Sequence, residues 1–212
     1  MAKKWIGYIG VGSLMCAALG CGILYTRQAR LQQTISDKVL RFHVLANSDS
    51  EADQNLKLAV RDAVGSFMQE KLTDVENLEE CELVVRQSLG EIEEAAAETI
   101  AENGYDYDVT AELEHTSFPV KNYGSYTFPA GVYEALRIVI GEGNGHNWWC
   151  VMYPNMCFSD SMYEVVDEEA GEKLRKVLTT EEYEKVLAEG GYQVRMKYFS
   201  WLNPYLEKLA EN

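Results

Sequence analysis

Histidine and basic side chains are scarce in this chain. Of its 212 residues only 3 are histidines, and 19 lysines and arginines stand against 34 aspartates and glutamates, which gives a formal net charge of −15. So acidic a chain repels nucleic-acid phosphates and anionic membrane surfaces, which argues against both as ligands of the folded part. With so few histidines, no pairing with a cysteine carries the signature of a nucleophilic enzyme.

Two further catalytic signatures are missing. The glycine-rich residues 141–145 lack the lysine and the following helix of a phosphate loop. Asp106 and Asp108 alternate with apolar residues as on a solvated strand face, whereas a glycosidase pair needs one carboxyl group in an apolar setting. We therefore expect neither catalysis nor a bound cofactor.

A long apolar run is present near the amino terminus. Residues 5–25 carry no charged side chain and follow Lys3 and Lys4. At about 1.5 Å per residue, a helix of this length matches the roughly 30 Å of a bilayer core. No clear cleavage site follows, so residues 1–25 are either a signal peptide or an uncleaved signal anchor. In both cases we expect the rest of the chain to be exported from the cytoplasm.

Composition divides the remaining chain into three parts. Residues 26–38 are polar and show little periodicity, which predicts a tether. Residues 39–158 contain the clearest strand and helix patterns and are expected to form the main α+β domain. Residues 159–212 are acidic, and their spaced leucines and valines predict a C-terminal helical subdomain.

Periodicity predicts an α+β fold for the main domain. The expected strands are 39–45, 105–114, 133–140 and 148–153, and the expected helices are 51–72 and 77–103. Ser50, with Asp53 three residues later, resembles a capping box at the start of the first helix. We expect the second helix to bend near Gly90 and to end at Gly104. Short connections favour a mostly antiparallel sheet with the two N-terminal helices packed on one of its faces.

The chain is organised around residues 117–158, which combine a glycine-rich loop with two adjacent tryptophans and two cysteines. Neighbours on a strand point to opposite faces, so Trp148 and Trp149 cannot enter the same core. Cys150 and Cys157 frame a Pro-Asn turn, and in an exported domain they are expected to form a disulfide. Two buried free thiols, or a partial zinc site with His146, are the alternatives.

Three blocks of sequence resemble one known family. They are LRFHVLANSDSEADQNLKLAVRDAV from Leu40, SFPVKNYGSYTFPAGVYEALRI from Ser117 and GNGHNWWCVMYPNMCF from Gly143. These blocks are similar to stage II sporulation protein R of endospore-forming bacteria. The resemblance implies a signalling protein made in the forespore and exported into the space between the two membranes. There, proteins like it trigger a membrane-embedded aspartic protease of the mother cell, which processes the inactive precursor of sigma-E.

For a signalling protein, aromatic anchors beside a polar loop are the expected partner-binding surface. The residues expected in it are Tyr123, His146, Asn147, Trp148 and Trp149. The alternative is that one or both tryptophans are core residues. Tryptophans beside a polar loop also stack on sugars, so a cell-wall-binding domain or wall hydrolase is the competing function.

A second polar cluster is expected at the start of the first helix. Its members are Arg41, Asn47, Asp49, Arg61 and Asp62. Arg61 and Asp62 are adjacent on the helix, so we expect them not to bond to each other. Either is expected to tie down the Asn-Ser-Asp-Ser turn at 47–50, which is a structural role.

Overall fold

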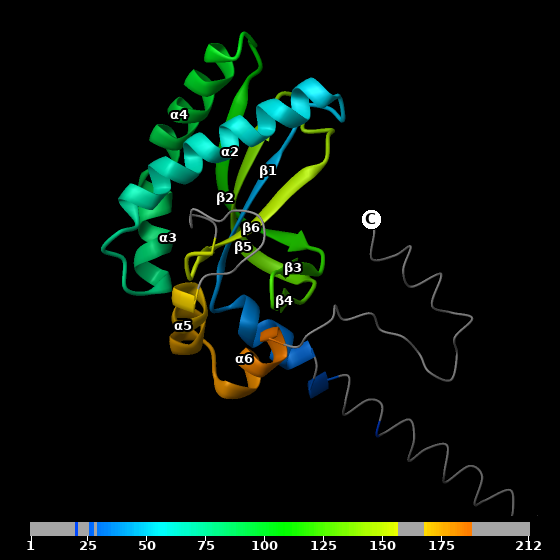
Figure 1. Ribbon diagram of the computed structural model, residues 1–212, viewed down its shortest axis with the longest axis vertical. Coiled ribbons are helices and arrows are strands. Elements are labelled where there is room, and N and C mark those ends of the chain that lie inside the picture. The colour runs from blue at the N-terminus through cyan, green and yellow to red at the C-terminus, as the bar shows by residue number, and fades with distance from the viewer. Residues whose placement is uncertain (1–19, 21–25, 28, 157–167, 188–212) are drawn as a thin grey trace, which may run out of the picture.

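The computed structural model describes residues 20, 26–27, 29–156 and 168–187 (Figure 1). The predicted apolar segment 5–25 lies outside this range apart from residue 20. Cys157, and residues 159–167 and 188–212 of the predicted C-terminal subdomain, also lie outside it. Among the described residues, no helix is long and apolar enough to cross a membrane.

A four-stranded mixed sheet forms the centre of the fold, with strands in the order β2-β5-β1-β6. These strands are β1 (Leu40–Leu45), β2 (Val109–Phe118), β5 (Gly131–Ile140) and β6 (Asn147–Tyr153). β1 runs parallel to β5 and antiparallel to β6, and β2 runs antiparallel to β5. A separate hairpin pairs β3 (Lys121–Tyr123) with β4 (Tyr126–Phe128). The α+β fold with mostly antiparallel pairing is confirmed.

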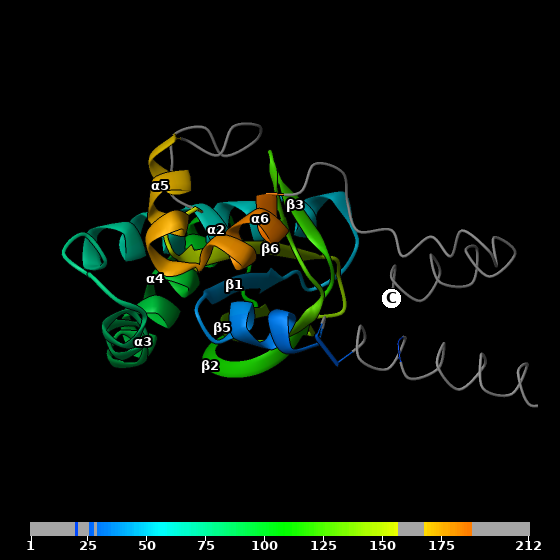
Figure 2. The same ribbon diagram turned by 90° about the horizontal axis from the view of Figure 1, so that it is seen from below.

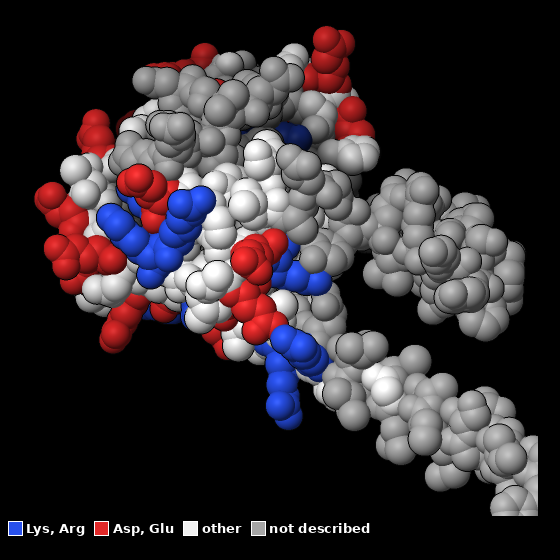
Figure 3. Space-filling view, turned by 60° about the horizontal axis from the view of Figure 1, so that its bottom comes forward, with Lys and Arg blue, Asp and Glu red and all other residues white. Residues whose placement is uncertain are grey.

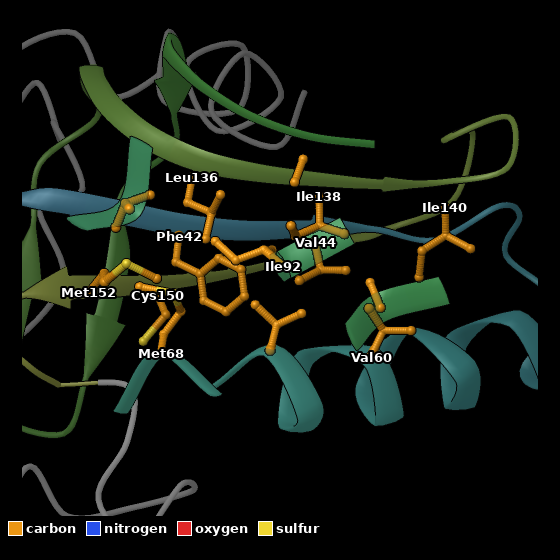
Figure 4. Close-up of a cluster of buried hydrophobic side chains, with 14 of the residues drawn as sticks. Phe42, Val44, Val60, Met68, Ile92, Leu136, Ile138, Ile140, Cys150 and Met152 are labelled. Atoms are coloured by element: carbon orange, nitrogen blue, oxygen red, sulfur yellow. The ribbon is translucent and has the colours of Figure 1, made fainter. Parts of the chain in front are cut away.

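Helices cover one face of the sheet and build the first hydrophobic core (Figures 1 and 4). They are α2 (Glu51–Lys71), α3 (Leu78–Gln87) and α4 (Leu89–Glu102). The core side chains labelled in Figure 4 are Phe42, Val44, Val60, Met68, Ile92, Leu136, Ile138, Ile140, Cys150 and Met152. Ser50 caps α2 as predicted, because its side chain accepts a hydrogen bond from the Asp53 amide. The predicted second helix is two helices that meet at Ser88.

The chain leaves α4 through a turn that shortens the next predicted strand. Gly104 has a φ of 83°, and the Tyr105 amide donates to the Ile100 carbonyl at 3.1 Å, which ends the helix. The rings of Tyr105 and Tyr107 stack 5.4 Å apart and pack against the first core. Residues 105–108 thus connect helix α4 to the sheet. The strand therefore begins at Val109 and not at Tyr105, where the sequence pattern predicted its start.

A second hydrophobic core lies on the other face of the sheet. It joins sheet and hairpin residues to α5 (Glu168–Val177), α6 (Thr180–Leu187) and the helical residues 29–36. Figure 2 shows α6 close to these helical residues, and Figure 3 shows both signs of charge on the face that carries α5 and α6. The buried members are Ile35, Val39, Phe118, Tyr126, Phe128, Tyr133, Ala135, Val151, Leu174, Leu178, Tyr183 and Val186.

The segment predicted as a polar tether is therefore partly helical and packed. Ile35 is fully buried in the second core. Arg27 bonds to Glu181 and Lys38 to Glu182, each at 2.7 Å, so two ion pairs join this segment to α6. The weak periodicity of 26–38 hid a short helix that buries Ile35 and packs the partly buried Leu31 against the second core.

Truncating Ile35 tests whether this segment belongs to the fold. We expect Ile35→Ala to lower the free energy of unfolding by about 2–4 kcal/mol, because a buried aliphatic side chain is lost and leaves a cavity. Arg30→Ala, an exposed change on the same helix, should alter it by less than about 0.5 kcal/mol. Urea titration of the purified chain measures both, and equal values would show that residues 29–36 are a loose tether.

Candidate functional site

Two loops meet where β1 ends and β6 begins, because these strands are antiparallel neighbours. Residues 46–50 follow β1, and residues 141–146 precede β6. The Gly145 amide donates to the Ala46 carbonyl at 2.9 Å, and the Asn47 side chain accepts from an amide of the second loop at 3.0 Å. The structure thus brings Asn47 and Asp49 of one predicted cluster beside His146 of the other.

Glycines allow the two loops to interlock. A Cβ at Gly145 would overlap the carbonyl group of Ser48, whose carbon would lie only 2.6 Å away. Gly141 has a φ of 56°, and a Cβ there would lie 2.9 Å from the Cγ of Asn47. Both positions therefore need glycine, one for close backbone approach and the other also for its backbone conformation.

The interlocked loops place the side chains of Asp49 and His146 next to each other at the surface. Asp49 Oδ1 accepts from the His146 amide at 2.6 Å and also from Nδ1 of the His146 ring. The His146 side chain remains 80% exposed and that of Asp49 56% exposed. These hydrogen bonds to His146 lower the pKa of Asp49, so its carboxylate is charged at neutral pH.

Two side chains of helix α2, those of Asp53 and Lys57, form hydrogen bonds to the two loops. The Asp53 carboxylate accepts from Asn47 Nδ2 at 3.0 Å and from the Ser48 hydroxyl. These bonds, with Ser48 the larger contributor, lower the pKa of Asp53. The Lys57 ammonium donates to the His146 carbonyl at 3.0 Å, and burial lowers the pKa of Lys57. Asp53 and Lys57 thus make ties to the loops that the sequence analysis attributed to Arg61 or Asp62.

Trp148 faces the first core, where it meets Phe42 and Arg61. Its ring lies edge-on to Phe42 with centroids 5.6 Å apart, and the Arg61 guanidinium lies 5.1 Å from its centroid. Arg61 Nε donates to Asp62 Oδ1 at 2.7 Å. The prediction that these two neighbours do not bond is wrong, because the long arginine side chain bends back to the adjacent carboxylate.

Trp149 faces the second core, as the strand alternation predicted for two adjacent tryptophans. It stacks on His43 with ring centroids 5.0 Å apart and an interplanar angle of 7°, and it meets Phe118 edge-on at 4.7 Å. The Lys121 ammonium lies 5.7 Å from the Trp149 centroid. Trp149 is half-buried, so one part of the ring belongs to the core and another reaches the surface.

His43 is a site residue that the sequence analysis did not select. Burial, then the charges of Arg137 and Arg41, lower the pKa of His43 to about 4, so it is neutral at physiological pH. Neither ring nitrogen has a hydrogen-bond partner of normal geometry. The sequence does place His43 two residues after Arg41 on one strand, and alternate residues of a strand share a face. This spacing could have indicated that His43 lies beside Arg41.

Arg41 lies fully buried in an aromatic cage. Its guanidinium carbon is 4.4 Å from the Phe118 centroid, and the rings of Tyr123, Phe128 and Tyr133 lie between 5.0 and 5.7 Å away. Nη2 donates to the Tyr123 hydroxyl at 2.9 Å. Tyr123, predicted to bind a partner, therefore already uses its hydroxyl within the molecule.

Cys150 is buried in the first core, on the same side of β6 as Trp148. Cys157 lies outside the described residues, so the disulfide stays a prediction. Within the described part of the chain, no group of three or more histidines, cysteines or acids is placed to hold a metal ion. The arrangement offers exposed hydrogen-bonding groups on a rigid support, which is suited to noncovalent recognition.

Comparison with known proteins gives one family. The family model described as stage II sporulation protein R matches residues 36–163. Stage II sporulation protein R of Bacillus subtilis (strain 168) is 40% identical over 156 residues, which cover 73% of this chain and 70% of that protein. No solved structure matches.

Gly145→Ala tests the interlock of the loops. We expect it to lower the free energy of unfolding by about 1–3 kcal/mol, because the added Cβ displaces the backbone at Ser48. Gly90→Ala is the matched control, since a Cβ at Gly90 meets nothing within 4 Å. That change should raise stability by about 0.5–1 kcal/mol, because alanine suits a helix better. Chemical denaturation of both variants measures this, and a destabilisation common to both would contradict the interlock.

The burial of His43 predicts a dependence of stability on pH. The unfolded chain binds a proton at His43 below the ordinary pKa of 6.5, whereas the folded chain binds it only below about 4. Stability should therefore be full above pH 6.5 and fall by on the order of 3 kcal/mol between pH 6.5 and 4. His43→Gln should flatten this part of the profile of unfolding free energy against pH. An unchanged slope in the variant would show that His43 is not buried as described.

Proposed function

The chain belongs to the stage II sporulation protein R family, and from this membership we propose that it is an exported signal between the two cells of a sporangium. It acts in the space between the forespore and mother-cell membranes, reached through the apolar segment 5–25. There it binds the external portion of a membrane-embedded aspartic protease. That protease then processes the precursor of sigma-E.

The observation that carries this proposal is the exposed pair Asp49 and His146 on its interlocked support. Two glycines, Asp53 and the buried Lys57 hold these two side chains at one end of the sheet. A rigid display of exposed polar groups beside half-buried tryptophans has the features of a protein interface. Rigidity also limits the entropy that is lost when a partner binds.

Activation by binding requires only a difference in affinity. If the protease exists in an inactive and an active state, a ligand that binds the active state more tightly shifts the population toward it. A tenfold shift corresponds to about 1.4 kcal/mol of differential binding, which one or two interface side chains can supply. The signalling chain itself then needs no catalytic group.

Reconstitution tests the proposal. The purified full chain is added to membranes that contain the protease and its precursor substrate, and binding and cleavage are measured against dose. We expect saturable binding with cleavage, and His146→Ala should need about a tenfold higher dose, because one exposed anchor is removed. His115→Ala is the matched control, since His115 is exposed on β2, away from the loops, and should act as wild type.

Two outcomes contradict the proposal. Retention of the chain on purified peptidoglycan, without binding to the protease membranes, would favour the cell-wall-binding alternative. Equal potency of the His146 and His115 variants would show that the loop pair does not contact the protease. Thermal unfolding of each variant establishes that a change in potency is not a change in folding.

A further inference from the structure

Two buried arginines lie on opposite sides of β6, and only one has a carboxylate partner among the described residues. Arg61 is 4% exposed, and its Nη2 lies 2.6 Å from Asp62 Oδ1. Arg41 is fully buried, and no described carboxylate lies within ion-pair distance of it. A buried charge without a counter-ion costs several kcal/mol unless other contacts offset that cost.

The contacts of Arg41 offset the cost only in part. Nε donates to the Cys150 carbonyl at 2.8 Å and Nη2 to the Tyr123 hydroxyl, while the aromatic cage stabilises the cation. Nη1 is buried and has no hydrogen-bond partner of normal geometry, although the guanidinium lies close enough to the Tyr133 hydroxyl to oppose the rise of the Tyr133 pKa. The guanidinium therefore keeps one edge with unused donor capacity.

His43 and Asn147 carry unused hydrogen-bonding atoms on the same face of the sheet. His43 is 2% exposed, and its two ring nitrogens and Asn147 Oδ1 have no hydrogen-bond partner of normal geometry. The Asn147 side chain nevertheless lies close enough to His43 to oppose, in small part, the lowering of the His43 pKa. Arg41 and His43 alternate along β1, and the strand register places Asn147 and Trp149 on their face of β6. Native interiors rarely leave so many polar atoms unpaired at one place, so the cluster calls for a functional explanation.

The sign of the local field favours an anion. Arg41 and Arg137 both act on His43 as positive charges, and Arg41 acts in the same way on Lys121. Arg137 is itself paired with Glu114 at 3.5 Å and with Glu112 at 3.8 Å, so Arg41 and Lys121 are the cations of this group that have no carboxylate partner among the described residues. A guanidinium edge is matched in shape by a carboxylate, which accepts two hydrogen bonds from neighbouring donors.

Trp149 lies over this cluster and is half-buried. Its indole rests flat on the imidazole of His43, and the Lys121 ammonium lies 5.7 Å from the indole centroid. Because Arg41 and His43 are buried, a ligand would reach them only if the Trp149 side chain rotated away from His43. Trp149 is the third residue of β6, and His146 lies in the loop immediately before that strand, so the cluster is close along the chain to the loop pair described above.

We propose that Arg41, His43 and Trp149 form a site that receives a carboxylate side chain of a partner protein. The carboxylate accepts hydrogen bonds from Arg41 Nη1 and from the His43 ring, and the indole of Trp149 packs against the methylene groups of the entering aspartate or glutamate. The inference rests on the proposed function only for the protein that supplies the carboxylate, which is the protease, through an acidic segment of its external portion.

Carboxylate binding is tested first on the full chain alone. The probe is N-acetyl-glutamate N-methylamide, and its uncharged match is the corresponding glutamine compound. We expect the glutamate compound to shift the indole N–H resonance of Trp149 saturably, and the glutamine compound to leave it in place. The resonance is assigned by its loss in Trp149→Phe. Equal responses to the two compounds, or no response to either, would overturn the site.

Variants separate the site from general loss of structure. Arg41→Lys keeps the charge but loses the planar edge, and it should weaken binding of the glutamate compound at least tenfold. Arg61→Lys is the matched control, because Arg61 is similarly buried beside the other tryptophan, and it should bind as wild type. Should Arg41→Lys fail to fold, His43→Phe provides the same test by removing both ring nitrogens. The assignment would be overturned if Arg41→Lys bound the glutamate compound as tightly as wild type does. The same holds for a folded His43→Phe variant.

Activation of the protease distinguishes the two proposals. Loss of activation in Arg41→Lys, with activation kept in Arg61→Lys, supports the carboxylate site as part of the signal. Full activation by an Arg41→Lys chain that no longer binds the glutamate compound overturns its role but leaves the signalling function intact. A wild-type chain that binds the compound but neither binds nor activates the protease overturns the signalling function and, with it, the protease as donor of the carboxylate.

Discussion

The burial of β1 on both faces is the constraint on which this structure depends. The strand has only six residues, yet it pairs with β5 on one edge and β6 on the other and separates two hydrophobic cores. Each of its side chains must therefore satisfy a packed environment. The apolar set, Phe42 and Val44 among them, does so by contact with α2, while Arg41 and His43 need aromatic and polar partners that the rest of the chain supplies.

The position of the candidate site follows from this arrangement. Because β6 is antiparallel to β1, its first residues must lie beside the turn that ends β1, and the two loops are brought together by the pairing itself. The glycines at 141 and 145 then decide how closely the loops approach. The adjacent tryptophans join the site to the interior, since each rests on a different core and each lies beside a cationic side chain.

Much of the fold could be predicted from local patterns, and little of the site could. Capping at Ser50, the alternation in β1 and the opposite orientations of Trp148 and Trp149 depend on spacing along the chain, and the sequence contains that information. The parallel pairing of β1 with β5, the burial of Ile35 and the ties from Asp53 and Lys57 depend on contacts between distant segments. The bond between Arg61 and Asp62 was missed for another reason. Helix spacing gives the positions of the Cβ atoms, and it does not describe how far a long, flexible side chain can bend toward its neighbour.

The pairing of β1 also determines when the central sheet can fold relative to synthesis of the chain. Its strand partners lie roughly a hundred residues later in the sequence, so the central sheet cannot form until β5 and β6 have been made. A chain built in this way stays open while its first half is synthesised. With the export proposed above, late closure of the sheet would leave the first half of the chain unfolded during its passage through a narrow channel, and the molecule would become compact only afterwards.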